Sequence, residues 1–223
     1  MDITLKQIAT IHTDFGEKFG VPRQSGIVPE LEGTIVFEPE FRNPDVVRGI
    51  EGFSHLWLIW GFSENVRDGW SATVRPPRLG GNERRGVFAT RSPFRPNPIG
   101  LSVVRLDSLT YEGEAASPVL HVLGADMMDG TPIYDIKPYI AYSDALAEAN
   151  SGFAASPPES RLKVVYDKIP AGLAPAKLAA LTGVLSQDPR PAYQDDPDRV
   201  YGIRFAGCDI HFKVIDNVLH VIE

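Results

Sequence analysis

Most of the chain alternates between apolar and polar residues or carries short apolar runs, and both patterns predict β-strands. The first such stretch, Ile3 to His12, slips out of phase near Gln7, which indicates a strand with a bulge. The stretch from His55 to Phe62 is almost continuously apolar and predicts a strand buried on both faces. Further strands are predicted for Gly33 to Glu38, Arg85 to Thr90, Leu101 to Leu109, Leu120 to Gly124 and Thr131 to Ile136.

Helical patterns are fewer in this part of the chain. Pro44 to Glu51 has its apolar residues on one side and Asp45 in its first turn, which predicts one or two helical turns. Short strands separated by Gly, Pro and Asp turns are typical of a β-barrel or a β-sandwich. Because no GxGxxG follows the first strand and strands do not alternate regularly with helices, the pattern does not favour a nucleotide-binding Rossmann domain.

The composition changes after Tyr139. The residues that follow are rich in Ala, Ser and Pro as far as Ser160, and we interpret them as a connector. Beyond the connector the pattern predicts an α+β arrangement, with Asp216-Asn217 as a tight turn between the last two strands. Its elements are Lys163 to Asp167 (strand), Pro175 to Ser186 (helix) and Tyr201 to Phe205, Ile210 to Ile215 and Val218 to Ile222 (strands). We therefore expect a mainly β protein, with an N-terminal β domain in residues 1–140, a connector in 141–160 and a small C-terminal α+β subdomain in 161–223.

Length and composition narrow the class of protein. With 223 residues, of which 43% are hydrophobic, the chain can bury a core and has the composition of a soluble globular protein. The N-terminus lacks the regions of a signal peptide, and the longest apolar run, Leu56 to Phe62, is too short to span a membrane, so we expect a cytoplasmic protein. The single cysteine, Cys208, and five histidines without metal-ligand spacing predict neither an intrachain disulfide nor a metal site.

Charge is distributed unevenly along the chain. Between Arg67 and Arg95 there are seven arginines against Asp68 and Glu83, so this segment has a net charge of +5. The rest of the chain has a net charge of −12, which gives the total of −7. Such asymmetry suits a protein that engages a polyanion at one place and is repelled from it elsewhere. Scattered solvated arginines would give the same count, and charge alone does not separate the two interpretations.

The stretch from Gly80 to Ser102 combines four glycines and three prolines with four arginines around one short apolar run, Val87 to Ala89. Proline disfavours the α region for the residue before it, so Ser92, Arg95 and Asn97 should be extended and the loop should be stiff. A stiff loop loses little entropy when it binds a ligand, which favours a binding wall. An ordinary proline-rich connection between strands would have the same composition.

Several long motifs, in one order, resemble those of a known family. FATRSPFRPNPIGLS (Phe88 to Ser102) and DGTPIYDIKPY (Asp129 to Tyr139) are similar to the signature of the TsaA/TrmO family, also called YaeB-like. The resemblance extends to KFGVPRQSG, VVRGIEGFSHLWLIW, TVRPPRLGGN and DPRPAY and covers nearly the whole chain. It implies a β-barrel, S-adenosylmethionine as cofactor, a homodimer, and methylation of N6 of threonylcarbamoyladenosine next to the tRNA anticodon.

The resemblance also implies which residues hold the cofactor. They are Pro22, Arg23, Gln24, His55, Leu56, Arg91, Leu101, Asp129, Gly130, Thr131 and Pro132. The Arg91 guanidinium suits a bidentate contact with the carboxylate of the cofactor, and Gln24 offers an amide to a base edge. The turn at Asp129 could bind ribose or the amino-acid tail through its backbone amides and side chains. A histidine at the start of an apolar strand, such as His55, is equally expected to pack against the core.

Methyl transfer from a sulfonium disperses charge, so positioning can supply much of the rate. Asp135 and Tyr134 lie beside the cofactor turn and are candidates to orient or accept the proton of the substrate nitrogen. A structural ion pair between Asp135 and Lys137 is the alternative. The unpaired bases of an anticodon stem-loop suit arginine and aromatic stacking. Our candidates for RNA contacts are Arg78, Arg84, Arg85, Phe94, Arg95, Arg190 and Tyr193.

Two classes of function fit this pattern. One is a tRNA methyltransferase, and the other is a module that senses S-adenosylmethionine without transferring its methyl group. Both need a cofactor pocket, but only the enzyme needs the arginine-rich segment and DPRPAY beside that pocket. The sequence therefore favours the enzyme.

Overall fold

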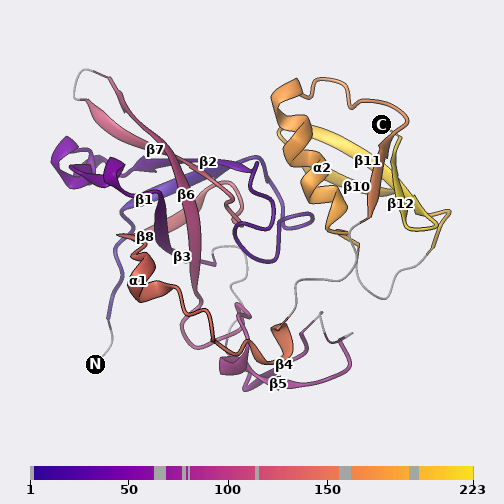
Figure 1. Ribbon diagram of the computed structural model, residues 1–223, viewed down its shortest axis with the longest axis horizontal. Helices are drawn as coiled ribbons and strands as arrows, with labels where there is room; N and C mark the ends of the chain where they lie inside the picture. Colours follow the sequence, from indigo (N-terminus) through magenta and orange to yellow (C-terminus); the bar gives the residue numbers. More distant parts are fainter. Residues whose placement is uncertain are drawn as a thin grey trace.

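The computed structural model describes residues 3–62, 69–76, 79, 81–113, 116–155, 162–190 and 196–222. Six strands close into an antiparallel barrel in the order β1-β2-β7-β6-β3-β8 (Figure 1). They are β1 (Ala9–Thr13), β2 (Glu32–Phe37), β3 (His55–Gly61), β6 (Ile99–Glu112), β7 (Ser117–Leu123) and β8 (Thr131–Pro138). The barrel that the resemblance implied is therefore confirmed, in preference to a sandwich.

The side chains of alternate residues in the strands point inward and fill the barrel. In β3 the side chains of Leu56, Leu58 and Trp60 are buried, whereas the residues that alternate with them, His55, Trp57 and Ile59, are only partly buried. The prediction that this strand is buried on both faces was wrong in this respect. Its outer face is apolar as well, which hid the alternation from the hydropathy pattern.

The first strand is shorter than predicted. It starts at Ala9, and Ile3 and Leu5 are exposed outside it. Ala9 pairs with Phe37, the last residue of β2, and a 3-10 helix, η1 (Pro39–Phe41), starts two residues later. Residues 3–7 therefore have no neighbouring strand in the described part of the chain, and hydrophobic alternation alone cannot form one.

The predicted helical turns before β3 are confirmed as the 3-10 helices η2 (Pro44–Val47) and η3 (Ile50–Gly52). Asn43 caps the first of them, since its side-chain oxygen accepts a hydrogen bond from the backbone N–H of Asp45 at 3.0 Å. Within the predicted connector lie the short helix α1 (Ala141–Asp144) and the 3-10 helix η7 (Gly152–Ala154).

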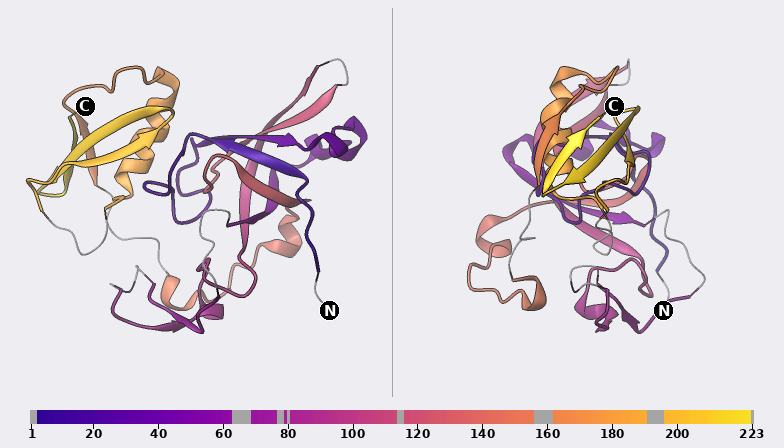
Figure 2. Two further views of the ribbon diagram at one scale, coloured as in Figure 1. Left: turned by 180° about the vertical axis from the view of Figure 1, so that it is seen from behind. Right: turned by 90° about the vertical axis from the view of Figure 1, so that its right-hand side faces the viewer.

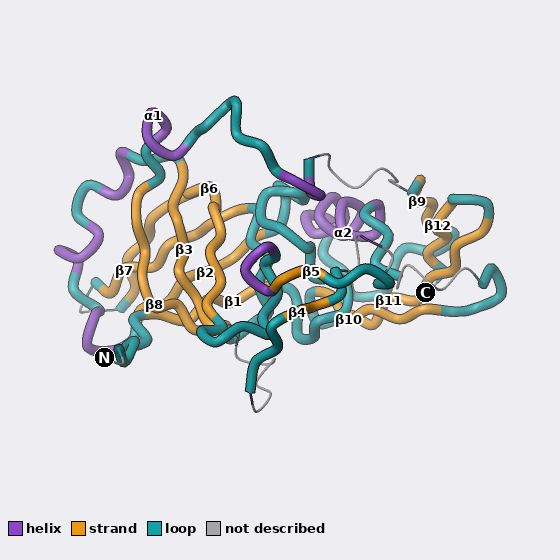
Figure 3. The backbone as a smooth tube through the Cα atoms, turned by 90° about the horizontal axis from the view of Figure 1, so that it is seen from below, coloured by secondary structure: helices purple, strands orange, loops and turns teal. Residues whose placement is uncertain are grey.

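A small two-stranded sheet stands apart from the barrel, formed by β4 (Thr73–Val74) and β5 (Arg85–Gly86). We call it, with the described residues that flank it from Gly69 to Arg95, the arm. It lies at the bottom of the molecule in Figure 1 and in front of the junction between the barrel and the C-terminal part in Figure 3. The predicted strand Arg85 to Thr90 ends after Gly86, because the chain turns into the 3-10 helix η6 (Val87–Ala89), which buries Val87.

The C-terminal part is a four-stranded sheet in the order β10-β11-β12-β9, and α2 (Leu178–Ser186) packs beside it (Figures 1 and 2). The other elements are β9 (Lys163–Tyr166), η8 (Pro175–Lys177), β10 (Tyr201–Phe205), β11 (Cys208–Ile215) and β12 (Val218–Val221). Asp216 and Asn217 have φ of 48° and 61°, as a tight turn between β11 and β12 requires. The small α+β arrangement predicted from the sequence is confirmed.

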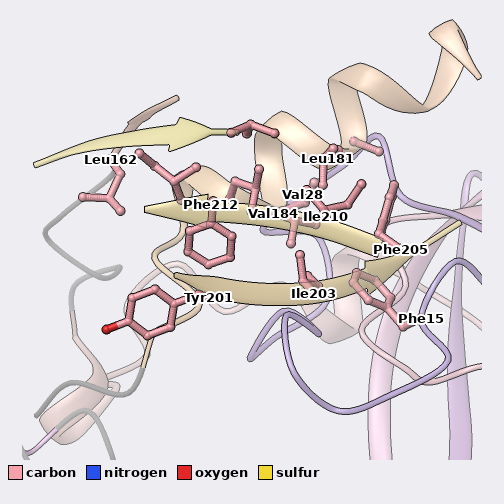
Figure 4. Packing of buried hydrophobic residues seen from close by; sticks show 14 of the residues in the cluster. Phe15, Val28, Leu162, Leu181, Val184, Tyr201, Ile203, Phe205, Ile210 and Phe212 are labelled. Carbon is pink, nitrogen blue, oxygen red and sulfur yellow. The ribbon is translucent and has the colours of Figure 1, made fainter. Parts of the chain in front are cut away.

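One connection joins the two parts more closely than the sequence indicated. Residues 14–31, between β1 and β2, place Phe15, Val28 and Leu31 in the core of the C-terminal sheet (Figure 4). The rings of Phe15 and Phe205 meet edge to face with centroids 5.4 Å apart. The hydrophobic core of the C-terminal part is thus completed by the N-terminal part. Within the described ranges, no helix has the length and apolar character that crossing a membrane demands.

Candidate active site

Three connections that carry predicted cofactor residues leave the barrel at one end, which we call the loop end. β3 finishes where β6 starts, with Gly61 opposite Ile99, and β1 finishes where β8 starts, with Ile11 opposite Thr131. The connections after β1, β3 and β7 therefore meet there. They carry Pro22 to Gln24, Arg91, and Asp129 with Gly130.

Two of these connections touch through predicted cofactor residues. Arg91 Nη1 donates a hydrogen bond to Gln24 Oε1, although the two residues are 67 positions apart. Gly26 N donates to Gly124 O at 2.9 Å and anchors the Gln24 loop to the barrel. Gly124 has φ of 78°, and a Cβ there would lie 3.2 Å from Gly26 Cα, so this crossing needs glycine at position 124. The crossing holds Gln24 beside Arg91.

A chain of hydrogen bonds that sequence reasoning missed lies next to Arg91. Trp60 Nε1 donates to Ser102 Oγ at 3.0 Å, and Ser102 Oγ donates to Asp126 Oδ1 at 2.6 Å. Burial raises the pKa of the Asp126 carboxyl above its ordinary value, while the Ser102 hydrogen bond and the charge of Arg91 act in the opposite direction. The motif that contains Asp126 continues directly into DGTP, and this proximity was the signal available in the sequence.

The turn that carries Asp129 uses its backbone amides within the protein. Asp129 N donates to Phe15 O at 2.8 Å, Gly130 N to Ile11 O at 3.0 Å, and Thr131 N to Met128 O at 3.3 Å. These amides are not available to a ligand, which corrects the expectation that they bind ribose or the amino-acid tail. The Asp129 carboxylate, 48% exposed, accepts from Thr13 N at 3.2 Å and lies 3.0 Å from His12 Nδ1.

Two cavities open around this end of the molecule. One of about 490 Å³ lies beside Asp129, between the barrel and the C-terminal part, and Asp14, Lys177 and Arg204 line it. A second, of about 210 Å³, is lined by the loop of Pro22 and Arg23 and by residues of the DPRPAY motif: Lys18, Phe19, Gly20, Val21, Pro22, Arg23, Ile27, Val184, Gln187, Asp188 and Pro189. The fold therefore brings residues of the two motifs together around one cavity.

Arg190 does not face solvent as an RNA contact requires. Its side chain is 9% exposed, and it makes a bidentate contact with Asp188, with Nε to Oδ1 at 2.8 Å and Nη2 to Oδ2 at 3.0 Å. Asp188 itself has φ of 52°, an uncommon conformation for a residue before proline. The pair stabilises a turn, and this corrects our assignment of Arg190 to RNA binding. Tyr193 lies outside the described residues.

His55 and Leu56 lie at the other end of the barrel. β3 runs from His55 to Gly61, about 20 Å for an extended strand, and its first residue is opposite Arg105, far from the loop end. The Leu56 side chain is fully buried in the barrel core, so only its backbone could meet a ligand. Leu101 is 54% exposed on the outer face near the loop end, opposite Ile59. Within one chain the predicted cofactor residues thus form two separate groups.

The two candidates for the proton lie on β8. Lys137 Nζ is 2.7 Å from Asp135 Oδ2, so the ion pair that we considered as the alternative is present. Tyr134 packs on Gly61, where a Cβ would come within 2.5 Å of the tyrosine hydroxyl. Glycine at this position lets the ring lie flat against the outer face of β3, at the loop end.

The comparisons with known proteins bear on the whole chain. Residues 10–145 match the family model of the tRNA-methyltransferase O N-terminal domain, and residues 164–223 match that of the TrmO C-terminal domain. The chain belongs to the TrmO family of methyltransferases. The crystal structure of TrmO from Pseudomonas aeruginosa, 33% identical, superposes with a TM-score of 0.80 and covers 100% of this chain and 98% of that one.

Curated relatives of this TrmO-family chain carry the name tRNA (adenine(37)-N6)-methyltransferase. One, from Escherichia coli (strain K12), is 39% identical over 220 residues, which are 95% of this chain and 93% of the relative. Another, from Eikenella corrodens, is 46% identical over 163 residues, which are 73% of this chain and 91% of the relative.

The arm of this TrmO-family chain contains most of the residues expected to contact RNA. Arg84 is exposed and donates to Thr73 Oγ1 at 2.7 Å, and Arg85 pairs with Glu83 at 2.6 Å. Arg95 instead donates to three backbone carbonyls of the arm, those of Ser92 at 2.8 Å, of Val87 at 3.2 Å and of Thr90. Its guanidinium therefore holds the arm together, and we withdraw it from the RNA-binding set. Phe94 is partly buried, and Arg78 lies outside the described residues.

Proposed function

We propose that the chain transfers a methyl group from S-adenosylmethionine to N6 of threonylcarbamoyladenosine next to the anticodon of tRNA. The observation that carries the proposal is the loop end, where Arg91 contacts Gln24 and where the connection that carries Asp129 also leaves the barrel, beside an arginine-rich arm. The names of the relatives, which specify an adenine of tRNA and its N6 atom, support the same reaction.

The residues of the loop end fit the groups of the cofactor. The Arg91 guanidinium, held at Gln24, presents paired N–H donors to the carboxylate of the amino-acid tail. The half-exposed Asp129 carboxylate can accept hydrogen bonds from ribose hydroxyls or from the amino group of the tail. S-adenosylmethionine supplies an activated methyl group on its sulfonium. The neighbouring Asp126 carboxyl, whose pKa is raised by burial, interacts with the charge of Arg91 on this side of the site.

Transfer itself requires an in-line arrangement of the sulfonium, the methyl group and the substrate nitrogen, and the proton on N6 must leave. Tyr134, fixed against Gly61, and Asp135, fixed by Lys137, are the candidates that orient this proton. A rigid site suits a reaction whose rate depends on geometry.

We also propose that the working unit is a homodimer in which each site draws on two chains. In one chain, His55 lies at the far end of β3 from Arg91, and a second copy can bring its His55 to the loop end of the first. Mixing inactive Arg91→Ala and His55→Ala subunits then restores about a quarter of wild-type activity, because half of the dimers are mixed and each has one intact site. If each site belongs to one chain, the mixture stays inactive.

The decisive test of the reaction is nucleoside analysis of threonylcarbamoylated tRNA treated with the protein and methyl-labelled cofactor. Label in the N6-methylated nucleoside supports the proposal. Cofactor binding without transfer would instead indicate the sensor. We also propose that the enzyme acts in the cytoplasm.

A further inference from the structure

Two large aromatic side chains project from the arm into solvent. Trp70 is 56% exposed and Phe88 is 77% exposed. Leaving rings of this size in water forgoes the stabilisation that burial would bring. They also stand close along the backbone: Val87 N donates to Ala72 O at 3.0 Å, beyond the last ladder pair of Thr73 with Gly86. Phe88 directly follows Val87 and Trp70 precedes Ala72 by two residues, so both residues belong to the same end of the small sheet.

The arm holds both rings in a preformed arrangement. Arg95 donates to the carbonyls of Val87 and Thr90, and Thr90 Oγ1 donates to Val87 O at 2.9 Å. On the other side, Ser71 N donates to Phe94 O at 3.4 Å, so the residue after Trp70 is tied to the same loop. Side chains carried on an ordered backbone lose less entropy when they bind.

Two arginines lie on the same small sheet, next to its Val74–Arg85 pair. Arg75 and Arg84 are exposed, and neither has a carboxylate partner within the part of the chain that the structure describes. Aromatic rings interleaved with arginines on one surface are the arrangement that single-stranded nucleic acid prefers, because rings stack on unpaired bases and guanidinium groups meet phosphates.

We propose that Trp70 and Phe88 form a stacking surface for unpaired bases of the anticodon loop, with Arg75 and Arg84 at the flanking phosphates. This inference rests on the proposed function, which supplies the RNA. The competing occupant is a second copy of the chain. Two arms packed symmetrically would bring like charges together, which disfavours that arrangement.

The test compares binding of two RNA probes at one salt concentration: a synthetic anticodon stem-loop and a blunt duplex of the same stem. Phe88→Ala and Trp70→Ala should each weaken binding of the stem-loop by roughly 5- to 100-fold and leave duplex binding nearly unchanged. Phe88→Tyr keeps the ring and should restore affinity, whereas Phe88→Leu keeps only apolar area and should not. Tyr111→Ala, at a 51% exposed residue of the β6–β7 hairpin, is the matched control and should bind like wild type.

The outcomes separate this inference from the proposed function. If wild type binds the stem-loop and methylates tRNA but the ring variants behave like wild type, the stacking surface is wrong and the enzyme stands. If Phe88→Leu binds like wild type, or Phe88→Ala lowers the mass of the assembly in light scattering, the ring belongs to a protein interface. If wild type neither binds the stem-loop nor methylates tRNA, both proposals fall.

Discussion

Replacing Asp126 by asparagine separates its effect on stability from its effect on the cofactor site. The carboxyl accepts from Ser102 at 2.6 Å, and burial is the largest cause of its raised pKa. Asparagine keeps an acceptor for Ser102 but exchanges a charge-assisted hydrogen bond for a neutral one, a loss of about 1 kcal/mol. The amide also avoids the cost of burying a charge. The two effects oppose each other, so the free energy of unfolding at pH 7 should stay within about 1 kcal/mol of wild type.

The same substitution should weaken cofactor binding, because the charge interaction between the Asp126 carboxylate and Arg91 helps to hold the guanidinium in place. Losing Arg91 itself should cost about 1.5–3 kcal/mol, the value of a charged hydrogen bond. Asp126 acts through Arg91, so its loss should cost less, about 1 kcal/mol or fivefold in dissociation constant. Titration calorimetry with S-adenosylmethionine measures this loss of affinity. Asp126→Ala is the comparison for stability: it leaves the Ser102 hydroxyl without its acceptor and should lower the free energy of unfolding by about 1–3 kcal/mol.

The pH dependence of unfolding provides a second measurement. Because the folded-state pKa of Asp126 is above the ordinary value of 3.8, the folded protein holds this proton more tightly than the unfolded chain. The contribution of the group to stability is therefore greatest at low pH and falls as pH rises through the raised pKa. In urea unfolding, the free energy of unfolding of Asp126→Asn should therefore increase relative to that of wild type as pH rises through this window. Above the window the difference between the two should be constant. The reasoning fails if Asp126→Asn loses affinity equally in an Arg91→Ala background, or if it destabilises the protein by more than about 3 kcal/mol.

Three further changes test other parts of the site. Arg91→Ala should weaken S-adenosylmethionine by about 1.5–3 kcal/mol in calorimetry, and unchanged affinity in a folded variant would remove it from the site. Replacing Arg84 and Arg85 together by alanine should flatten the dependence of log affinity for the stem-loop on log salt by about one unit, with cofactor affinity nearly unchanged; an unchanged slope would place the arm away from the phosphates. Gly124→Ala should lower the free energy of unfolding by about 1–3 kcal/mol, because φ is 78° and the new Cβ would press on Gly26. Gly113→Ala is the control for the backbone cost alone, because Gly113 has φ of 68° and open space around it. Equal losses in the two variants would contradict the close contact between Gly124 and Gly26.

The strands could be predicted because most of them depend on local alternation. β2, β7, β8 and the C-terminal strands lie within a few residues of the predicted ranges, and the Asp216-Asn217 turn depends on residues that tolerate positive φ. β1 and β5 were predicted too long for a different reason. Their ends are set by partners elsewhere in the chain, the end of β2 in one case and the guanidinium of Arg95 in the other.

The candidate site likewise has residues that could be predicted from the sequence and contacts that could not. Motif positions identified Arg91 and Gln24, which the fold does bring into contact. Contacts that depend on tertiary packing were not visible in the sequence: the Ser102 hydrogen bond to Asp126, and the pairing of Arg190 with Asp188. The sequence alone does not distinguish an arginine that donates hydrogen bonds to backbone carbonyls or to a neighbouring carboxylate from one that contacts RNA.

The insertion of residues 14–31 into the C-terminal core has a consequence for how the molecule holds its shape. Phe15, Val28 and Leu31 are fixed in that core, and the same loop carries Gln24 to Arg91. Lys177 adds ion pairs at 2.8 Å to Asp14 and 2.7 Å to Glu32, at the two ends of the loop. Opening of the small sheet would therefore release the loop that shapes the proposed cofactor site. We therefore expect the two parts to unfold as one cooperative unit. The C-terminal sheet stabilises a binding loop that is distant from it in the sequence.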